Sequence, residues 1–231
     1  MGGGVLNARR RMMTMTQEVS KPYDAEVEYL EVNAESGHAY INTRYIATGA
    51  DINCQVVFMP LGYSEGARYA YFFGTPFSYP FNDSGENGVY RVLQNNGNVT
   101  GSLYINWGWS QHGNVSLGSF RLGEQNHIEI NGRENGVETI FNDRRSNIGT
   151  ANAVAENAAQ NPITLFSIPN TISDGIAYLR FYSFRLDKAG VPQLDLIPVR
   201  RGTEGFMYDR VSGKLLGNSG TGRFVLGPDL A

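Results

Sequence analysis

Cysteine is almost absent from this chain of 231 residues, and that absence limits how the fold is stabilised. Cys54 is the only one, so no disulfide can form within the chain and stability must come from packing. Cys54 lies in an alternating segment, residues 51–58, where it is expected to be a small buried apolar group and not a reactive thiol.

Long hydrophobic runs are also missing. No run is long enough to span a bilayer, so membrane insertion is not expected. Three arginines, Arg9, Arg10 and Arg11, stand near the start, but no apolar segment follows them as it would in a secretory leader. We therefore expect a protein made in the cytoplasm without a leader.

The usual catalytic and metal-binding motifs are absent as well. The sequence has no Gly-x-Ser-x-Gly elbow, no phosphate loop and no Cys-x-x-Cys pair. Its three histidines form no ligand cluster, so neither zinc nor any other metal or cofactor is predicted, and His127 is expected to be a hydrogen-bonded strand residue. A net charge of -3 gives no electrostatic footprint for nucleic acid.

Glycine and aromatic residues, in contrast, are plentiful. The chain has 28 glycines and 12% aromatic residues, and it lacks helical periodicity, which favours many strands joined by tight turns. The last quarter shows this most clearly, with strands predicted over residues 178–186, 193–200, 206–209, 214–216 and 223–226. Residues 178–186 are apolar on both faces, so that strand should be central. A further hairpin is predicted over residues 125–142, and residues 146–161 read as a long surface loop or a short helical turn.

Seven short segments resemble one family. They are EYLE (28–31), AYINT (39–43), NHIEING (126–132), AYLRFYSF (177–184), LIPVRR (196–201), GFMYD (205–209) and GNSGTG (217–222). Together they resemble concanavalin A-like (laminin-G-like) domains of the bacteriophage, prophage and gut-bacterial type. The resemblance implies an all-β fold, an antiparallel jelly-roll sandwich of the lectin/glucanase kind, over residues 23–231.

Residues 1–22 differ in character from the rest and are expected to form a short N-terminal arm. Their basic residues outweigh Glu18, and methionines stand among them as adaptable apolar contacts. The arm is either a solvated tail or a segment that docks on a partner protein, with contacts from Arg9, Arg10, Arg11, Met12, Met13 and Met15.

The candidate carbohydrate-binding residues lie in the loops between residues 58 and 121. Trp109 either packs in the core beside Trp107 or projects from a rim loop. On a rim its exposed indole can stack on a sugar ring, and polar side chains beside it can bind hydroxyl groups. These candidates are Tyr79, Asp83, Trp109, Gln111 and His112. The turn at residues 82–88 is rich in oxygen ligands but lacks the spacing of a calcium hand, so whether calcium binds stays open.

Three carboxylates alternate along the first predicted strand: Asp24, Glu26 and Glu28. Paired acidic residues on a strand serve some glycoside hydrolases as nucleophile and general acid. Such charges are more often a solvated or edge-protecting face, so a hydrolase is the last of the functions considered.

The resemblance implies a non-enzymatic structural or adhesion protein of a phage or prophage particle. It would decorate a capsid or belong to a fibre or tail, and it would contact virion proteins through the arm. Glycans are further expected partners, and many copies, or a homo-oligomer, would make weak sites useful. The alternative is a bacterial carbohydrate-binding, lectin-like module. We expect the protein on the virion, after synthesis in the host cytoplasm, or alternatively on a bacterial cell surface.

Overall fold

The structure is a computed structural model, and it describes residues 21–48, 51–64, 69–75, 90–95, 100–107, 115–133, 136–148, 161–167 and 175–231. Every regular element among them is a β-strand. The all-β class predicted from the sequence is therefore confirmed. Within these residues, no helix is long and apolar enough to cross a bilayer.

Seventeen strands make up the described part of the chain. They are β1 (Ala25–Glu26), β2 (Leu30–Val32), β3 (Ile41–Asn42), β4 (Ile52–Tyr63), β5 (Tyr69–Gly74), β6 (Tyr90–Asn95), β7 (Thr100–Trp107), β8 (Val115–Arg121), β9 (Asn126–Arg133), β10 (Gly136–Phe141), β11 (Arg144–Ile148), β12 (Thr164–Leu165), β13 (Gly175–Lys188), β14 (Val191–Arg201), β15 (Glu204–Asp209), β16 (Lys214–Leu216) and β17 (Val225–Leu226).

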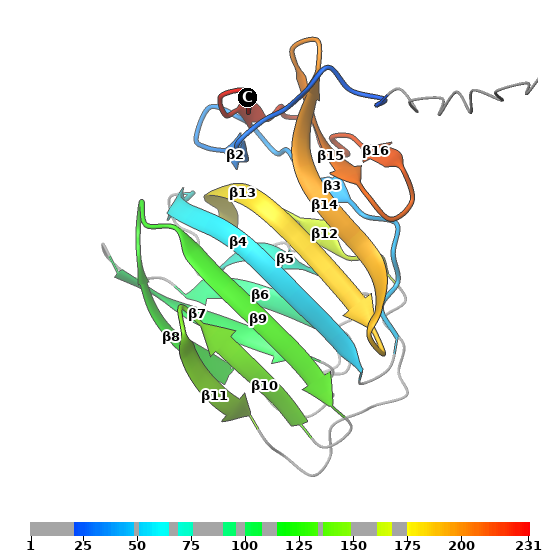
Figure 1. The fold of residues 1–231 in the computed structure, drawn as a ribbon. Coiled ribbons are helices and arrows are strands. Elements are labelled where there is room, and N and C mark those ends of the chain that lie inside the picture. The colour runs from blue at the N-terminus through cyan, green and yellow to red at the C-terminus, as the bar shows by residue number, and fades with distance from the viewer. Residues whose placement is uncertain are drawn as a thin grey trace, which may run out of the picture.

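The strands form two layers (Figure 1). In the first sheet, antiparallel pairing gives the order β11, β10, β9, β4, β13, β14, β15, β16, while β2 and β17 extend it beside β13. In the second sheet the order is β3, β12, β5, β6, β7, β8. The start of β13 also pairs with β5 in parallel, which links the two sheets.

Aromatic side chains fill the space between the sheets. Phe58 of β4 lies 5.1 Å from Phe72 of β5, and Phe73 of β5 lies 5.3 Å from Phe184 of β13, as ring centroids in edge-to-face contact. All four side chains are buried. Edge-to-face packing adds to the hydrophobic stabilisation that such large buried rings supply.

Two hairpins predicted from their turn residues are confirmed. β15 and β16 pair across the turn at residues 210–213, and β9 pairs with β10. β13 lies between β4 and β14, so its predicted central place is also confirmed. Cys54 is 1% exposed, and burial raises the pKa of its thiol well above the usual value.

Two element predictions need correction. The segment from Ser146 was expected to be a loop or helical turn, but residues 146–148 belong to β11, which pairs with β10. Asn142 and Asp143 both adopt positive φ (45° and 67°), the two-residue turn that joins twisted antiparallel strands. The predicted acidic first strand shortens to two residues, Ala25 and Glu26, paired with β14.

Candidate functional site

A polar surface covers the solvent side of three neighbouring strands in the middle of the first sheet. Along β4 and β9, buried residues alternate with residues that reach solvent. The outward side chains are those of Asn53, Gln55, His127, Glu129, Asn131, Arg185 and Asp187, which together we call the polar sheet face. Figure 1 shows β4, β9 and β13 side by side in the front sheet.

Strand register places these side chains in rows. Gln55 of β4 pairs with Glu129 of β9 on one side and with Arg185 of β13 on the other. Two residues along, Asn53 pairs with Asn131 and Asp187 in the same way. Side chains opposite one another on adjacent strands are about 5 Å apart, and alternate residues along a strand are about 7 Å apart. The seven groups therefore form a continuous patch.

His127 and Glu129 are neighbours on one strand. The Nε2 atom of His127 lies 3.6 Å from Oε1 of Glu129, and the two side chains are 41% and 28% exposed. That distance is too long for a hydrogen bond, so both groups keep hydrogen-bonding capacity for a ligand. An imidazole beside a carboxylate can also carry a proton to or from a bound molecule.

Arg185 supplies the positive charge of the polar sheet face. Its Nε donates to both carboxylate oxygens of Asp187 at 3.2 and 3.3 Å, and this hydrogen bond raises the pKa of Arg185 above its usual value. The Arg185 side chain is 45% exposed. A guanidinium held in this way keeps donors for a further acceptor, such as a hydroxyl or carboxylate oxygen.

One edge of the patch is fixed by a second ionic group. Glu138 of β10 accepts hydrogen bonds from Arg133 at 2.9 Å and from Arg145 at 2.6 Å. Glu138 is 11% exposed, whereas both arginines project into solvent. Three strands are thus tied together beside Asn131, which supports the adjoining rows.

This set of groups suits a polyhydroxylated ligand. Amides, carboxylates and a guanidinium provide donors and acceptors at fixed intervals, as a site for an oriented polar ligand requires. Among the residues that the structure describes, no cluster of three or more His, Cys, Asp or Glu could hold a metal ion.

The binding residues predicted from the sequence fall in two other parts of the chain. Tyr79, Asp83, Trp109, Gln111 and His112 lie outside the described residues, as do the arm residues Arg9, Arg10, Arg11, Met12, Met13 and Met15. Those assignments stay predictions. The polar sheet face is a different location, on strands and not in the loops.

The acidic start of the domain has structural partners. Glu26 accepts hydrogen bonds from Lys21 at 2.9 Å and from Tyr23 at 2.8 Å, and the Lys21 bond lowers the pKa of Glu26. Asp24 accepts from the backbone amide of Gly202 at 2.7 Å. These two carboxylates therefore join the start of the domain to neighbouring groups.

Sequence reasoning missed Gln55, Glu129, Arg185 and Asp187 as site residues. The signal was present in each strand, because polar residues alternate with apolar ones at 53–55, 127–131 and 185–187. What the sequence does not show is that β4 lies between β9 and β13. Only that non-local pairing brings the three polar edges into one surface.

Comparison with known proteins yields only distant structural likeness. No protein-family model and no curated protein sequence matches the chain. A family 7 alginate lyase solved with substrate is 13% identical with a TM-score of 0.42, covering 65% of this chain and 66% of its own. A pentraxin from Limulus polyphemus is 10% identical with a TM-score of 0.48, covering 90% and 96%. An alginate lyase from Pseudomonas aeruginosa is 12% identical with a TM-score of 0.41, covering 60% and 65%.

These matches agree with the all-β jelly-roll sandwich of the chain. At such low identity the likeness concerns the fold alone. The phage and gut-bacterial subtype that the sequence resembles is not shown, and the chain spans about two thirds of the alginate lyases it matches (66% and 65%).

Two predictions of function are corrected by these matches. We expected a non-enzymatic phage structural or adhesion protein, but the similar structures named above are alginate lyases and a pentraxin, and none of them is a virion protein. The expectation that the chain is not an enzyme is corrected as well: alginate lyases are among the similar structures, so a sandwich of this kind does not exclude catalysis. The error arose because the function of the resembled family was assigned to this chain, although the resemblance specified only the fold.

Proposed function

We propose that the chain is a carbohydrate-active protein that binds a polysaccharide across the polar sheet face. The observation that carries this proposal is the row formed by Glu129, Gln55 and Arg185 on three adjacent strands. A polysaccharide presents hydroxyl groups at regular intervals, and the row offers acceptors and donors at intervals of about 5 Å. An extended ligand can lie on such a face without an enclosed pocket.

The charge of the face also bears on the ligand. Arg185 is paired with Asp187, and Glu138 with Arg133 and Arg145, so charges of both signs are interspersed. Recognition must then depend on hydrogen bonds to sugar oxygens more than on net charge. Each hydrogen bond of this kind contributes about 0.5–1.5 kcal/mol net, so several are needed for useful affinity.

Affinity electrophoresis through gels containing single polysaccharides tests the proposal. The chain is expected to be retarded by at least one of alginate, pectin, xylan and dextran. Gln55→Ala combined with Glu129→Ala should restore free migration, whereas Lys214→Ala, an exposed change on β16, should not. Equal retardation of the double variant and the parent chain would show that the ligand binds elsewhere.

A second candidate function is cleavage of the bound glycan, favoured by the imidazole and carboxylate of His127 and Glu129 at 3.6 Å. One of them would accept a proton from the substrate, or donate one to it, during bond cleavage. Release of new chain ends is the readout. His127→Ala should abolish that release while Lys214→Ala leaves it unchanged, and release unaffected by His127→Ala would rule out this role.

A further inference from the structure

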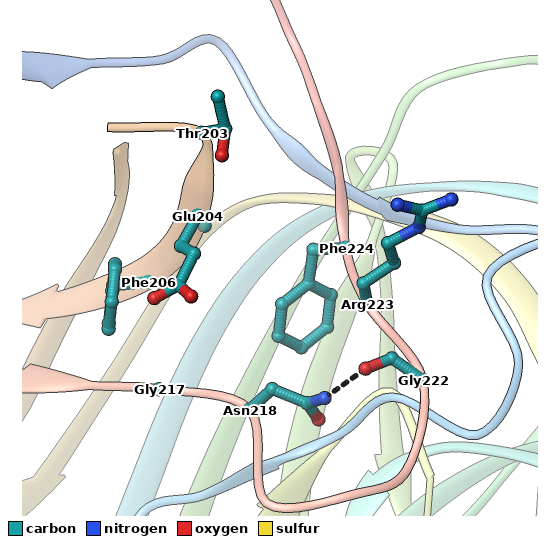
Figure 2. A pocket seen from close by; sticks show the side chains of 9 residues that line it. Thr203, Glu204, Phe206, Gly217, Asn218, Gly222, Arg223 and Phe224 are labelled. Atoms are coloured by element: carbon teal, nitrogen blue, oxygen red, sulfur yellow. Dashed lines mark hydrogen bonds between the residues drawn. The ribbon is translucent and has the colours of Figure 1, made fainter. Parts of the chain in front are cut away.

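A hollow of about 510 Å³ lies between β15 and the loop that follows β16, formed by residues that are not part of the polar sheet face (Figure 2). Its lining includes Thr203, Glu204 and Phe206, and, from the C-terminal segment, Gly217 and Phe224. A volume of this size is within the range of about 300–1,000 Å³ that small-molecule sites occupy.

The loop side of the hollow is held rigidly. The Asn218 side chain accepts hydrogen bonds from the backbone amides of Tyr40 at 3.1 Å and Gly220 at 2.8 Å, and it donates to the carbonyl of Gly222. Figure 2 shows the bond from Asn218 to Gly222 crossing the lower edge of the hollow. The Asn218 amide is therefore used within the loop and shapes the site without being free to bind a ligand.

Two aromatic rings provide apolar surface. Phe224 is 8% exposed and rests on Phe166 with ring centroids 4.8 Å apart. Phe206 is partly exposed, and a side chain at Gly217 would come within 3.2 Å of its ring, so the absence of one lets the loop lie directly against Phe206. Rings fixed in this way can stack on the apolar face of a ligand at little entropic cost.

Glu204 contributes a carboxylate to the hollow. Its side chain is exposed and makes no hydrogen bond or ion pair with any other described residue. Figure 2 shows its carboxylate beside the Phe206 ring, on the side that faces Phe224. A carboxylate next to aromatic surface can accept two hydrogen bonds from one ligand.

Charge decides which ligand class fits best. Glu204 opposes an anionic ligand, while Arg201, whose guanidinium lies 5.3 Å from the Phe206 ring centroid, and Arg223, on the rim, oppose a cationic one. A neutral ring with hydroxyl groups on its edge and an apolar face meets neither repulsion. We propose that this hollow binds a single neutral sugar ring, with Glu204 accepting from its hydroxyl groups and Phe206 stacking on its face.

Saturation-transfer NMR on the full chain tests this second site, with the methyl glycosides of glucose, galactose and mannose as probes at millimolar concentration. Transfer to at least one neutral glycoside is expected. Glu204→Ala should weaken the interaction about tenfold, as the loss of hydrogen bonds to a charged acceptor predicts. Phe206→Leu should do the same by removing the stacking surface, and since Glu204 is exposed, its variant decides the matter if Phe206→Leu fails to fold.

The controls separate this inference from the polysaccharide proposal. The same measurement on the chain carrying Gln55→Ala and Glu129→Ala removes binding at the polar sheet face, so the transfer that remains there and is lost with Glu204→Ala comes from the hollow. Lys214→Ala, an exposed change outside both sites, should leave the transfer unchanged. Absence of transfer from all three glycosides would overturn the inference. So would transfer that survives Glu204→Ala, or stronger transfer to glucosamine or glucuronate than to the neutral glycosides.

Discussion

In the C-terminal loop, the backbone at Gly222 lies so close to residues 36–38 that no side chain fits there. At Gly222, an added Cβ atom would stand 2.0 Å from the carbonyl oxygen of Ser36 and 2.8 Å from backbone atoms of Gly37 and His38. None of these neighbours is a flexible side chain that could move aside. The glycine-rich segment at residues 217–222, part of the family resemblance, therefore has a steric cause.

Gly222→Ala should lower the free energy of unfolding by about 1–3 kcal/mol or more, because the loop must move away from the backbone of Ser36. Denaturant unfolding measures the change. Ser219→Ala is the matched control, since Ser219 is exposed and its hydrogen bond to Tyr40 comes from its backbone amide. Equal stability of the two variants would show that no such contact exists in solution.

A charged pair near the C-terminus makes stability depend on pH. Both oxygens of Asp229 accept from Arg200, at 2.7 and 2.6 Å, and this bond lowers the pKa of Asp229 below the usual 3.8. A carboxylate with a depressed folded-state pKa stabilises the fold above its unfolded pKa, and this stability is lost as the pH falls through the folded value.

Asp229→Asn should therefore lower the melting temperature at neutral pH, and the difference from the parent chain should shrink as the pH falls below 3.8. Thermal unfolding across the acid range measures it. The pair is exposed, so the effect should also weaken in high salt. A difference that stays constant from neutral to acid pH would mean that the carboxylate charge is not responsible.

At the scale of elements, β2 is joined to β13 by an ion pair across the strands. Glu31 pairs in register with Arg180 and accepts from its Nε at 2.6 Å, and the Arg180 guanidinium lies 4.2 Å from the Tyr29 ring centroid. The Glu31 side chain is only 9% exposed. Loss of the cation would leave a nearly buried carboxylate without its charge partner.

Arg180→Met should destabilise the fold by about 2–4 kcal/mol, somewhat less than for a fully buried pair because Arg180 is 29% exposed. Adding Glu31→Gln should recover part of this loss, since a neutral amide tolerates burial better than a carboxylate. A double-mutant cycle by chemical unfolding gives the coupling. Strictly additive effects would show that the two side chains do not interact in solution.

The sequence predicted those elements that short-range chemistry determines. The β15–β16 hairpin and the β9–β10 hairpin follow from turn residues and alternation, and the apolar faces of residues 178–186 place β13 at the centre. The order of the strands in the sheet could not be predicted from local patterns, because β4 pairs with β13, more than a hundred residues later along the chain. Positive φ at Asn142 and Asp143 created β11 where polar composition indicated a loop.

At the scale of the whole molecule, the all-β class and the jelly-roll sandwich were predicted correctly, while the function was not. The sandwich gives a rigid support on which β4, β9 and β13 present polar side chains in register. The docking arm, the loop residues with Trp109, and the place of the protein on a particle or a cell surface stay predictions. The resemblance in sequence identified the fold, and proteins of many different functions share one fold.

The most direct test of the central claim is chemical-shift mapping of the isotope-labelled chain during titration with oligosaccharides of the polysaccharide that retards it. We predict that the largest shifts fall on Gln55, His127, Glu129 and Arg185, on three strands but in one surface patch. Shifts confined to other parts of the chain, or none at saturating ligand, would contradict polysaccharide binding at the polar sheet face.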